Sequence, residues 1–270
     1  MPIEIRHHDG RVLFVSQRMT ELRAALYEAA ERGIDLAGAA LEGADLTASN
    51  LERARLDGAK LATASLRRSN LEEASLRGAD LSRASVDSSN LEEAVLEDAC
   101  LAGANLRGSN LEEADLTRAD LSGACADGSN LEEAILSSAV LVRASFARAN
   151  LERARLDHVQ ADSASFVAAN LEKADLRGAD LRKANLRGAN LEKANLRGAC
   201  LASAVLAGAN LEKADLRDAD LRDADLREAN LERCDLAGAH LDGANLEGAN
   251  LDGVRGWSGD KPPSSGGPYR

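Results

Sequence analysis

Leucine recurs at every fifth residue from Leu36 to Leu251, without an insertion or a deletion. Of the 44 sites in this column 39 are leucine, and the exceptions are Val86, Ala126, Phe146, Ala161 and Phe166. A second column, two residues earlier, is alanine at 36 of 44 sites. A period of five fits neither an α-helix nor a single strand. It predicts a solenoid, in which each coil buries its apolar residues by stacking on its neighbours.

Glycine placement divides each repeat into an inner and an outer part. Every glycine between residues 34 and 253 stands two residues after a central site, as Gly38 and Gly43 do. Glycine is favoured where a turn needs a positive φ, so this position is the predicted corner of the coil. The central residue and the residue two before it then point inward, because side chains alternate along an extended segment. The other three positions lie outside and carry nearly all of the charge.

A longer period of twenty residues lies over the first. Asn-Leu-Glu begins at Asn50 and recurs every twenty residues to Asn230, and Asn250-Leu251-Asp252 closes the series. Each coil therefore has four sides, and stacked asparagines on one of them can form a hydrogen-bonded ladder. On this side the corner residue is Glu, Arg or Lys until Gly253. Because a positive φ is costly for such residues, we expect a different turn type there.

The two phenylalanines of the leucine column test the register of the coils. Phe146 and Phe166 are one coil apart, so they are predicted to lie one above the other. Ala126 lies below Phe146, and Ala161 lies on the adjacent side. A coil of fixed cross-section requires a large core side chain to be packed beside a small one. This pattern indicates compensation of volume in the core, in preference to a ligand pocket.

The segment before the repeats has its own pattern. Alternating apolar residues within 3–15 flank Asp9-Gly10, which is a strong signal for a β-hairpin. Apolar residues at helical spacing predict a helix over 20–32, with Thr20 as the N-cap and Gly33 as the C-terminal stop. Hairpin and helix together would cover the first coil.

These patterns predict three parts of the chain. Residues 1–33 form a cap, which an open solenoid end requires because it exposes apolar core and unpaired strand edges. Residues 34–253 form the repeat array. In the tail, 254–270, Val254 and Trp257 are expected to fold over the last coil, and the residues after Trp257 to be disordered.

Composition narrows the class of protein. A net charge of −12 argues against direct nucleic-acid binding, which needs a basic surface. Aromatic residues are only 2% of the chain, as expected of a narrow Leu and Ala core. The spacing of the four cysteines fits neither a zinc motif nor a disulfide framework. With no apolar stretch long enough for a membrane span and no signal-peptide pattern, we expect a cytoplasmic protein that does not contact a membrane.

Residues that could carry chemistry are few, and no catalytic, cofactor or metal site is predicted. The four histidines have no partner at a useful spacing: His7, His8, His158 and His240. Cys234 occupies the inner column and is predicted to be a core residue. Three other cysteines are predicted to face outward: Cys100, Cys125 and Cys200. We therefore expect a protein that is not an enzyme.

Repeats such as Ala179-Asp180-Leu181-Arg182-Lys183 resemble the A-(D/N)-L-x-x signature of the pentapeptide repeat family, and the resemblance covers residues 34–252. It implies an all-β solenoid, a right-handed quadrilateral parallel β-helix with four short strands per coil. With 11 coils at roughly 4.8 Å each, the rod would be about 53 Å long. The best-understood members bind DNA gyrase and its relatives as acidic mimics of duplex DNA, and protect them from topoisomerase poisons.

Charge is concentrated in one block. Residues 70–133 hold 15 Asp and Glu but only 4 Lys and Arg. On the asparagine side, this block places four pairs of carboxylates one coil apart: Glu72, Glu73, Glu92, Glu93, Glu112, Glu113, Glu132 and Glu133. We call these eight residues the acidic strip. Stacked like charges repel each other, and from Arg153 onward the second residue of each pair becomes basic, which would relieve the repulsion.

Two interpretations of the acidic strip remain open. It binds a basic protein or a cation, or it is a solvated surface kept by duplication of a Ser-Asn-Leu-Glu-Glu-Ala unit. The predicted function is a non-enzymatic scaffold or protein-interaction rod of unknown partner. The alternative is a gyrase-binding DNA mimic, which the absence of inserted loops and of a following amphipathic helix disfavours. The chain is expected to be a monomer, or a homodimer formed through its C-terminal end.

Overall fold

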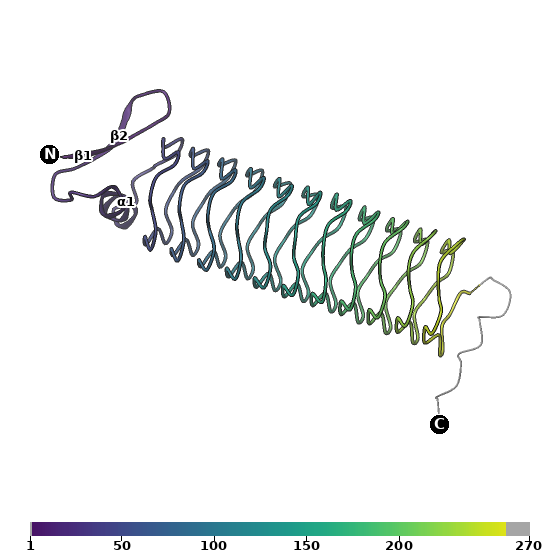
Figure 1. Cartoon of the computed structure of the whole chain (residues 1–270). Coiled ribbons are helices and arrows are strands. Elements are labelled where there is room, and N and C mark those ends of the chain that lie inside the picture. The colour runs from purple at the N-terminus through teal and green to yellow at the C-terminus, as the bar shows by residue number, and fades with distance from the viewer. Residues whose placement is uncertain (1, 258–270) are drawn as a thin grey trace.

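Each coil of the structure contains four sides that pair with the same sides of the coils above and below. In this computed structural model, which describes residues 2–257, parallel β-bridges join residues twenty positions apart. They begin with Asp35 and Arg55 and continue to Asp235 and Arg255. The coils stack into an elongated rod (Figure 1). The predicted β-helix solenoid is confirmed.

The core is the pair of columns that the sequence repeats. Inside the array the leucine and alanine columns are fully buried, as at Leu171 and Ala174. The rings of Phe146 and Phe166 stack with their centroids 5.3 Å apart and their planes 7° apart, which confirms the predicted register. The small residue Ala126 is buried on the same side, one coil before Phe146. Two flat rings in one column therefore fit a cross-section built for leucine.

The corners contradict one prediction. All corner residues from Gly38 to Gly253 have a positive φ, whether or not they are glycine. On the asparagine side φ is 54° at Glu93 and 58° at Lys193, close to the 62° of Gly178 on another side. The expectation of a different turn type on the asparagine side is therefore wrong.

Backbone hydrogen bonds explain why these corners tolerate charged residues. The N–H of Glu93 donates to the carbonyl of Glu112 in the next coil at 2.9 Å, and the N–H of Ala94 closes the turn on Leu91 at 3.0 Å. The same two bonds flank Gly178 at 3.0 and 3.1 Å. A left-handed residue other than glycine costs roughly 1–2 kcal/mol. The repeated bonds between coils offset that cost at the corners from Gly38 to Arg233.

The N-terminal unit consists of a hairpin and one helix. Strands β1 (Ile3–Arg6) and β2 (Val12–Ser16) pair antiparallel, and helix α1 spans Leu22–Glu31. The helix begins one residue later than the predicted N-cap implies: Glu21, not Thr20, occupies the N-cap position, and its side chain makes no capping hydrogen bond. Gly33, with φ of 61°, follows the end of the helix as expected.

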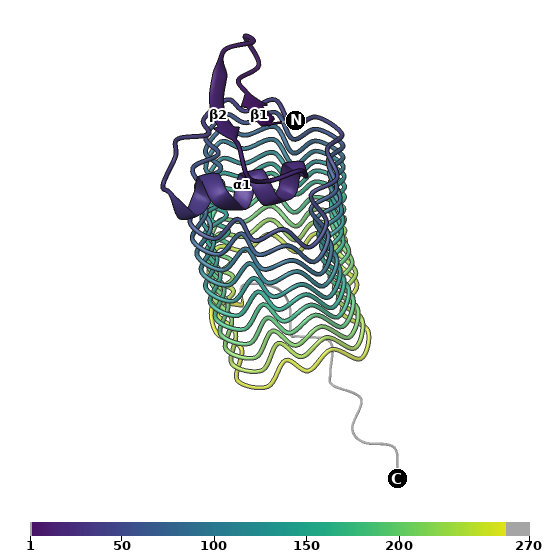
Figure 2. The same ribbon diagram turned by 90° about the vertical axis from the view of Figure 1, so that its left-hand side faces the viewer.

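Hairpin and helix lie over the first coil (Figures 1 and 2). The N–H of His8 donates to the carbonyl of Gly38 at 2.9 Å, and the N–H of Ala40 donates to that of Arg6 at 2.8 Å. One face of α1 buries Ala25, Leu26 and Ala29 completely. The apolar start of the array is thereby covered.

At the other end of the described chain the core is more open. Leu241, Leu246 and Leu251 are only half-buried, whereas Leu231 is fully buried. Val254 and Trp257 pack against this end as partly buried residues. The prediction of a disordered tail falls on residues 258–270, which lie outside the described part. Within residues 2–257 the structure contains no helix long and apolar enough to cross a membrane.

Candidate functional site: the acidic strip

An asparagine ladder fixes the side of the rod that carries the acidic strip. From Asn70 to Asn250, each side-chain amide donates through Nδ2 to Oδ1 of the asparagine one coil earlier, at 3.0–3.3 Å. The same oxygen accepts the backbone N–H two residues on, as Oδ1 of Asn70 does from Glu72 at 3.2 Å. The ladder therefore positions the backbone on which each glutamate stands.

The first glutamate of each acidic pair is hydrogen-bonded to the ladder. Nδ2 of Asn110 donates to Oε2 of Glu92 at 3.0 Å as well as to Asn90. Equivalent bonds to Glu72 and Glu112 are 3.0 Å long, and the bond to Glu132 is 3.2 Å long. These four carboxylates are half-buried. Their position is thus set by the protein before any partner arrives.

The second glutamate of each pair occupies the corner and is exposed. At the N-terminal end of the strip, Arg53 forms a two-pronged ion pair with Glu73 at 2.6 and 2.9 Å. Hydrogen bonding to this guanidinium holds the pKa of the Glu73 carboxyl below its usual value. At the C-terminal end, Arg153 lies 3.0 Å from Glu133.

The centre of the strip has no such compensation. Within residues 2–257, no Lys, Arg or His lies within ion-pair distance of Glu92, Glu93, Glu112 or Glu113. The run of carboxylates without a basic partner is therefore shorter than the sequence predicted, because Glu73 and Glu133 at the ends of the strip form ion pairs. We call these four glutamates the uncompensated centre.

Beyond the strip the predicted pairing with basic residues occurs. Lys173 lies 2.7 Å from Glu172 and 3.3 Å from Glu152. The next two coils repeat the pair, with Lys193 at 2.7 Å from its glutamate and Lys213 at 2.5 Å. Hydrogen bonding to Glu172 raises the pKa of the Lys173 ammonium. This half of the asparagine side is charge-balanced.

Among the other residues considered for chemistry, the rings of His7 and His8 lie side by side, with their centroids 4.0 Å apart. The thiol of Cys234 is buried and donates to the carbonyl of Leu211 at 2.8 Å, and burial raises its pKa to about 12. The other three cysteines are half-buried on the outside. In the described part of the chain, no group of three His, Cys, Asp or Glu side chains is arranged to hold a metal ion.

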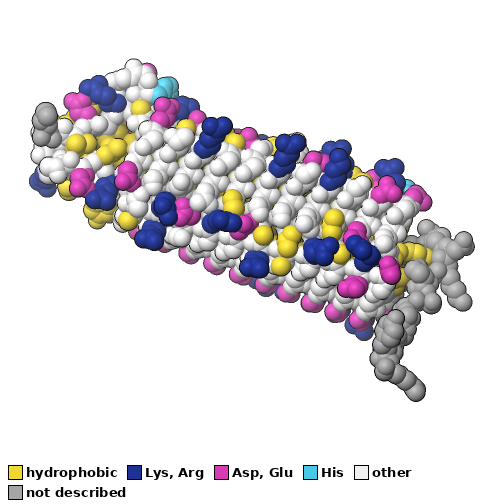
Figure 3. Space-filling model, in the orientation of Figure 1, with side chains coloured by type: hydrophobic (Ala, Val, Ile, Leu, Met, Phe, Trp, Pro, Cys, Tyr) yellow, Lys and Arg dark blue, Asp and Glu magenta, His cyan; other side chains and the backbone are white. Residues whose placement is uncertain are grey.

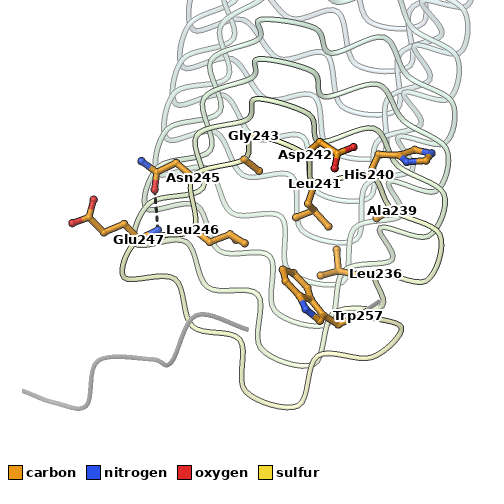
Figure 4. Close-up of a pocket in the computed structure, with 11 residues that line it drawn as sticks. Leu236, Ala239, His240, Leu241, Asp242, Gly243, Asn245, Leu246, Glu247 and Trp257 are labelled. Atoms are coloured by element: carbon orange, nitrogen blue, oxygen red, sulfur yellow. Dashed lines mark hydrogen bonds between the residues drawn. The ribbon is translucent and has the colours of Figure 1, made fainter. Parts of the chain in front are cut away.

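A hollow of about 810 Å³ lies at the C-terminal end of the described chain (Figure 4). Trp257 and the half-buried Leu241 and Leu246 line it, together with polar residues that include His240 and Asp242. Among the residues drawn, the marked hydrogen bond runs from the N–H of Glu247 to Oδ1 of Asn245, at 3.0 Å. The lining is mostly core left open at the end of the stack.

Sequence reasoning missed a second set of charged pairs on the other three sides. Arg222 holds both oxygens of Asp220, at 2.7 and 2.8 Å, and Arg217 holds Asp215 in the same way. The signal was present as Asp-Leu-Arg, which places the two side chains on one strand face. Charged side chains of both signs are spread over the rod, with apolar side chains visible between them (Figure 3).

The repeats of this chain match the model of a known protein family. The family model described as pentapeptide repeats matches residues 32–61, 63–98, 94–132, 127–159, 164–201, 199–236 and 219–255. A search of curated proteins finds no match to the chain.

Several solved structures are similar to this chain. HetL, a pentapeptide repeat protein involved in heterocyst differentiation regulation in the cyanobacterium Nostoc sp. strain PCC 7120, is 34% identical, with a TM-score of 0.40; the match covers 85% of this chain and 96% of HetL. Trypsin-treated QnrB1, a plasmid-mediated fluoroquinolone resistance protein, is 22% identical over 76% of this chain and 86% of its own, with a TM-score of 0.39. A pentapeptide repeat protein from the thylakoid lumen of Arabidopsis thaliana is 30% identical over 45% of this chain and 71% of its own, with a TM-score of 0.33.

Proposed function

The chain belongs to the pentapeptide repeat family, and we propose that it is a non-enzymatic interaction rod or scaffold whose acidic strip binds a basic protein. The observation that carries this proposal is the uncompensated centre. Glu93 and Glu113 are exposed, and Glu92 and Glu112 are held by the asparagine ladder, with no cation of residues 2–257 beside them.

Repulsion within the uncompensated centre favours binding. Like charges on neighbouring strands destabilise each other, and a cationic partner would relieve that repulsion. Because the ladder already orients Glu92 and Glu112, little side-chain entropy is lost when they are engaged. The partner would present Lys or Arg side chains about 5 Å apart, which is the spacing of the coils. The four free thiols fit the cytoplasm as the proposed location.

Substitution at the corners tests this proposal without disturbing the ladder. The variant Glu93→Lys/Glu113→Lys places lysine where Lys193 and Lys213 stand in the second half, at the same positive φ. The matched control is Asp223→Lys/Glu228→Lys, which makes the same charge change at corners outside the strip. In a pull-down from cell extract, wild type and control should recover the same partner, and the strip variant should lose it. Equal recovery by all three baits would mean that the strip is only a solvated surface.

The second hypothesis, a DNA mimic that binds gyrase, is tested separately. It requires an extended polyanion, whereas the uncompensated centre occupies two coils, with Arg53 and Arg153 beyond it. The short acidic surface favours a partner with a compact basic surface over a partner with a long groove that binds duplex DNA. In a gyrase supercoiling assay with and without a quinolone, we expect no inhibition and no protection by added protein. Protection that is lost in Glu93→Lys/Glu113→Lys would favour the mimic instead.

A further inference from the structure

One side of the rod lacks carboxylates over four consecutive coils. This side immediately precedes the asparagine side in each coil and comprises residues 143–149, 163–169, 183–189 and 203–209. The same side carries Asp127 in the coil before and Asp223, Asp225 and Glu228 in the coil after. A stretch without Asp or Glu is unusual on a protein of net charge −12.

Basic residues occupy this side without partners. Four basic residues stand on it or at its two corners: Arg143, Arg148, Lys183 and Arg187. We call this set the cationic stripe. Within residues 2–257, no carboxylate lies within ion-pair distance of any of the four. Their charges are therefore available to another molecule.

The surroundings of the cationic stripe favour contact with a protein. The side chains that point outward between the charges include Ala147, Val167, Val205 and Ala207, all half-buried. Small apolar side chains on a flat sheet face have little hydration to lose when another surface covers them. The stripe thus combines unpaired positive charge with a partly apolar floor.

Charge is also divided along the rod. Residues 134–213 contain 12 Lys and Arg against 8 Asp and Glu, a net charge of +4. Residues 70–133 have a net charge of −11. The acidic block is therefore followed directly by a basic block.

We propose that the cationic stripe binds the acidic strip of a second copy of this chain. The two surfaces have opposite charge. The acidic strip extends over four coils, and the charges of the cationic stripe stand on two coils, with Arg143 and Arg148 on one and Lys183 and Arg187 two coils further on. Because both are built on the same coil spacing of about 4.8 Å, the two charged coils of the cationic stripe can face two coils of the acidic strip at once. This inference rests on the same acidic strip as the proposed function, but it adds a second surface and a defined partner.

The positions of the two surfaces determine the kind of assembly. They lie on adjacent sides of the coil and at different heights along the rod. A contact between them joins two different surfaces, so each added copy leaves one acidic strip and one cationic stripe free. Association should therefore grow with concentration, in a staggered array of rods.

Two charge-reversal variants test the contact. Arg143→Glu/Arg148→Glu reverses two of the four charges of the cationic stripe and keeps the acidic strip, and Glu93→Lys/Glu113→Lys reverses two charges of the strip and keeps the stripe. All four positions are corners with φ between 54° and 59°, and glutamate and lysine both occupy such corners elsewhere in the array. Both variants should therefore fold. The matched control, Arg68→Glu/Arg83→Glu, reverses the same charges in the same two corner columns, outside the stripe.

Sedimentation equilibrium is the measurement. Wild type and control should associate, and each variant alone should be monomeric, with a dissociation constant raised at least about tenfold. An equimolar mixture of the two variants should form a one-to-one dimer, because one supplies an intact stripe and the other an intact strip. Both the wild-type assembly and this dimer should dissociate in about 1 M salt, where the Debye length is roughly 3 Å.

Other outcomes would overturn the inference. A monomeric wild type, or a mixture that stays monomeric, would contradict it. An assembly that persists in both variants and in high salt would instead indicate contact through the C-terminal end. The pull-down keeps the two proposals apart: Arg143→Glu/Arg148→Glu retains the strip and should still recover the basic partner, even if self-association is disproved.

Discussion

The N-terminal and C-terminal halves of the asparagine side differ in charge but have the same backbone conformation. In the first half the corner carries glutamate, as at Glu93, and in the second half it carries lysine, as at Lys193. Both corner N–H groups donate to the next coil at 2.9 Å, and their φ angles are 54° and 58°. The coil therefore accepts either charge without rearrangement, and the surface of the rod is free to vary independently of its fold.

The two halves differ in the hydrogen bonds that the asparagine side-chain amides of the ladder donate. Nδ2 of Asn110 donates to both Asn90 and Glu92. In the second half, Nδ2 of Asn190 donates to Asn170 and makes no bond to a glutamate of residues 2–257. The glutamates of that half form ion pairs with lysine instead, as Glu192 does with Lys193. A corner cation thus draws the glutamate away from the ladder. The uncompensated centre owes its fixed carboxylates to the absence of that cation.

The largest expected difference between the halves comes from removing one rung of the ladder. Asn110→Ala deletes four hydrogen bonds and leaves Oε2 of Glu92 without its donor, whereas Asn190→Ala deletes three. At roughly 0.5 kcal/mol per bond, we expect losses of about 2 and about 1.5 kcal/mol respectively. Hydrogen exchange of the neighbouring coils measures both, because repeat proteins open locally. Equal losses would show that the bond to Glu92 contributes nothing.

A smaller effect should follow from exchanging the corner charges. Glu93→Lys/Glu113→Lys should raise the melting temperature by about 1–2 °C, because it replaces stacked like charges with Glu–Lys pairs. Lys193→Glu/Lys213→Glu should lower it by a similar amount. Both shifts should shrink as salt is added. A first-half variant that is less stable than wild type would mean that strip repulsion is negligible.

The smallest effect concerns acid. Hydrogen bonding to Arg222 holds the pKa of Asp220 at about 2, below the ordinary 3.8. Because the folded pKa is depressed, the stabilisation is present above about pH 4 and is lost as the pH falls toward 2. Thermal melts of wild type and Arg222→Ala should therefore differ slightly at pH 7 and converge near pH 2. As the control, Arg83→Ala, which removes an arginine without an ion pair in residues 2–257, should show no such convergence.

Much of the rod was predictable because its period is short and uninterrupted. The spacing of leucine, alanine and asparagine identified the inner columns, the twenty-residue coil and the stacked phenylalanines. It also placed all eight glutamates of the acidic strip on one side and anticipated the lysine pairs that follow. Each of these conclusions depends only on where a residue falls within a repeat.

What a residue does at its position was decided by neighbouring coils. The corner of Glu93 adopts a positive φ against its own propensity, because bonds to the next coil fix it. Arg53 forms an ion pair with Glu73, which lies twenty residues further along the chain. The sequence by itself determined the fold and the side on which each charge lies. Only the tertiary structure decided which charges remain unpaired, since pairing depends on side-chain contacts between coils.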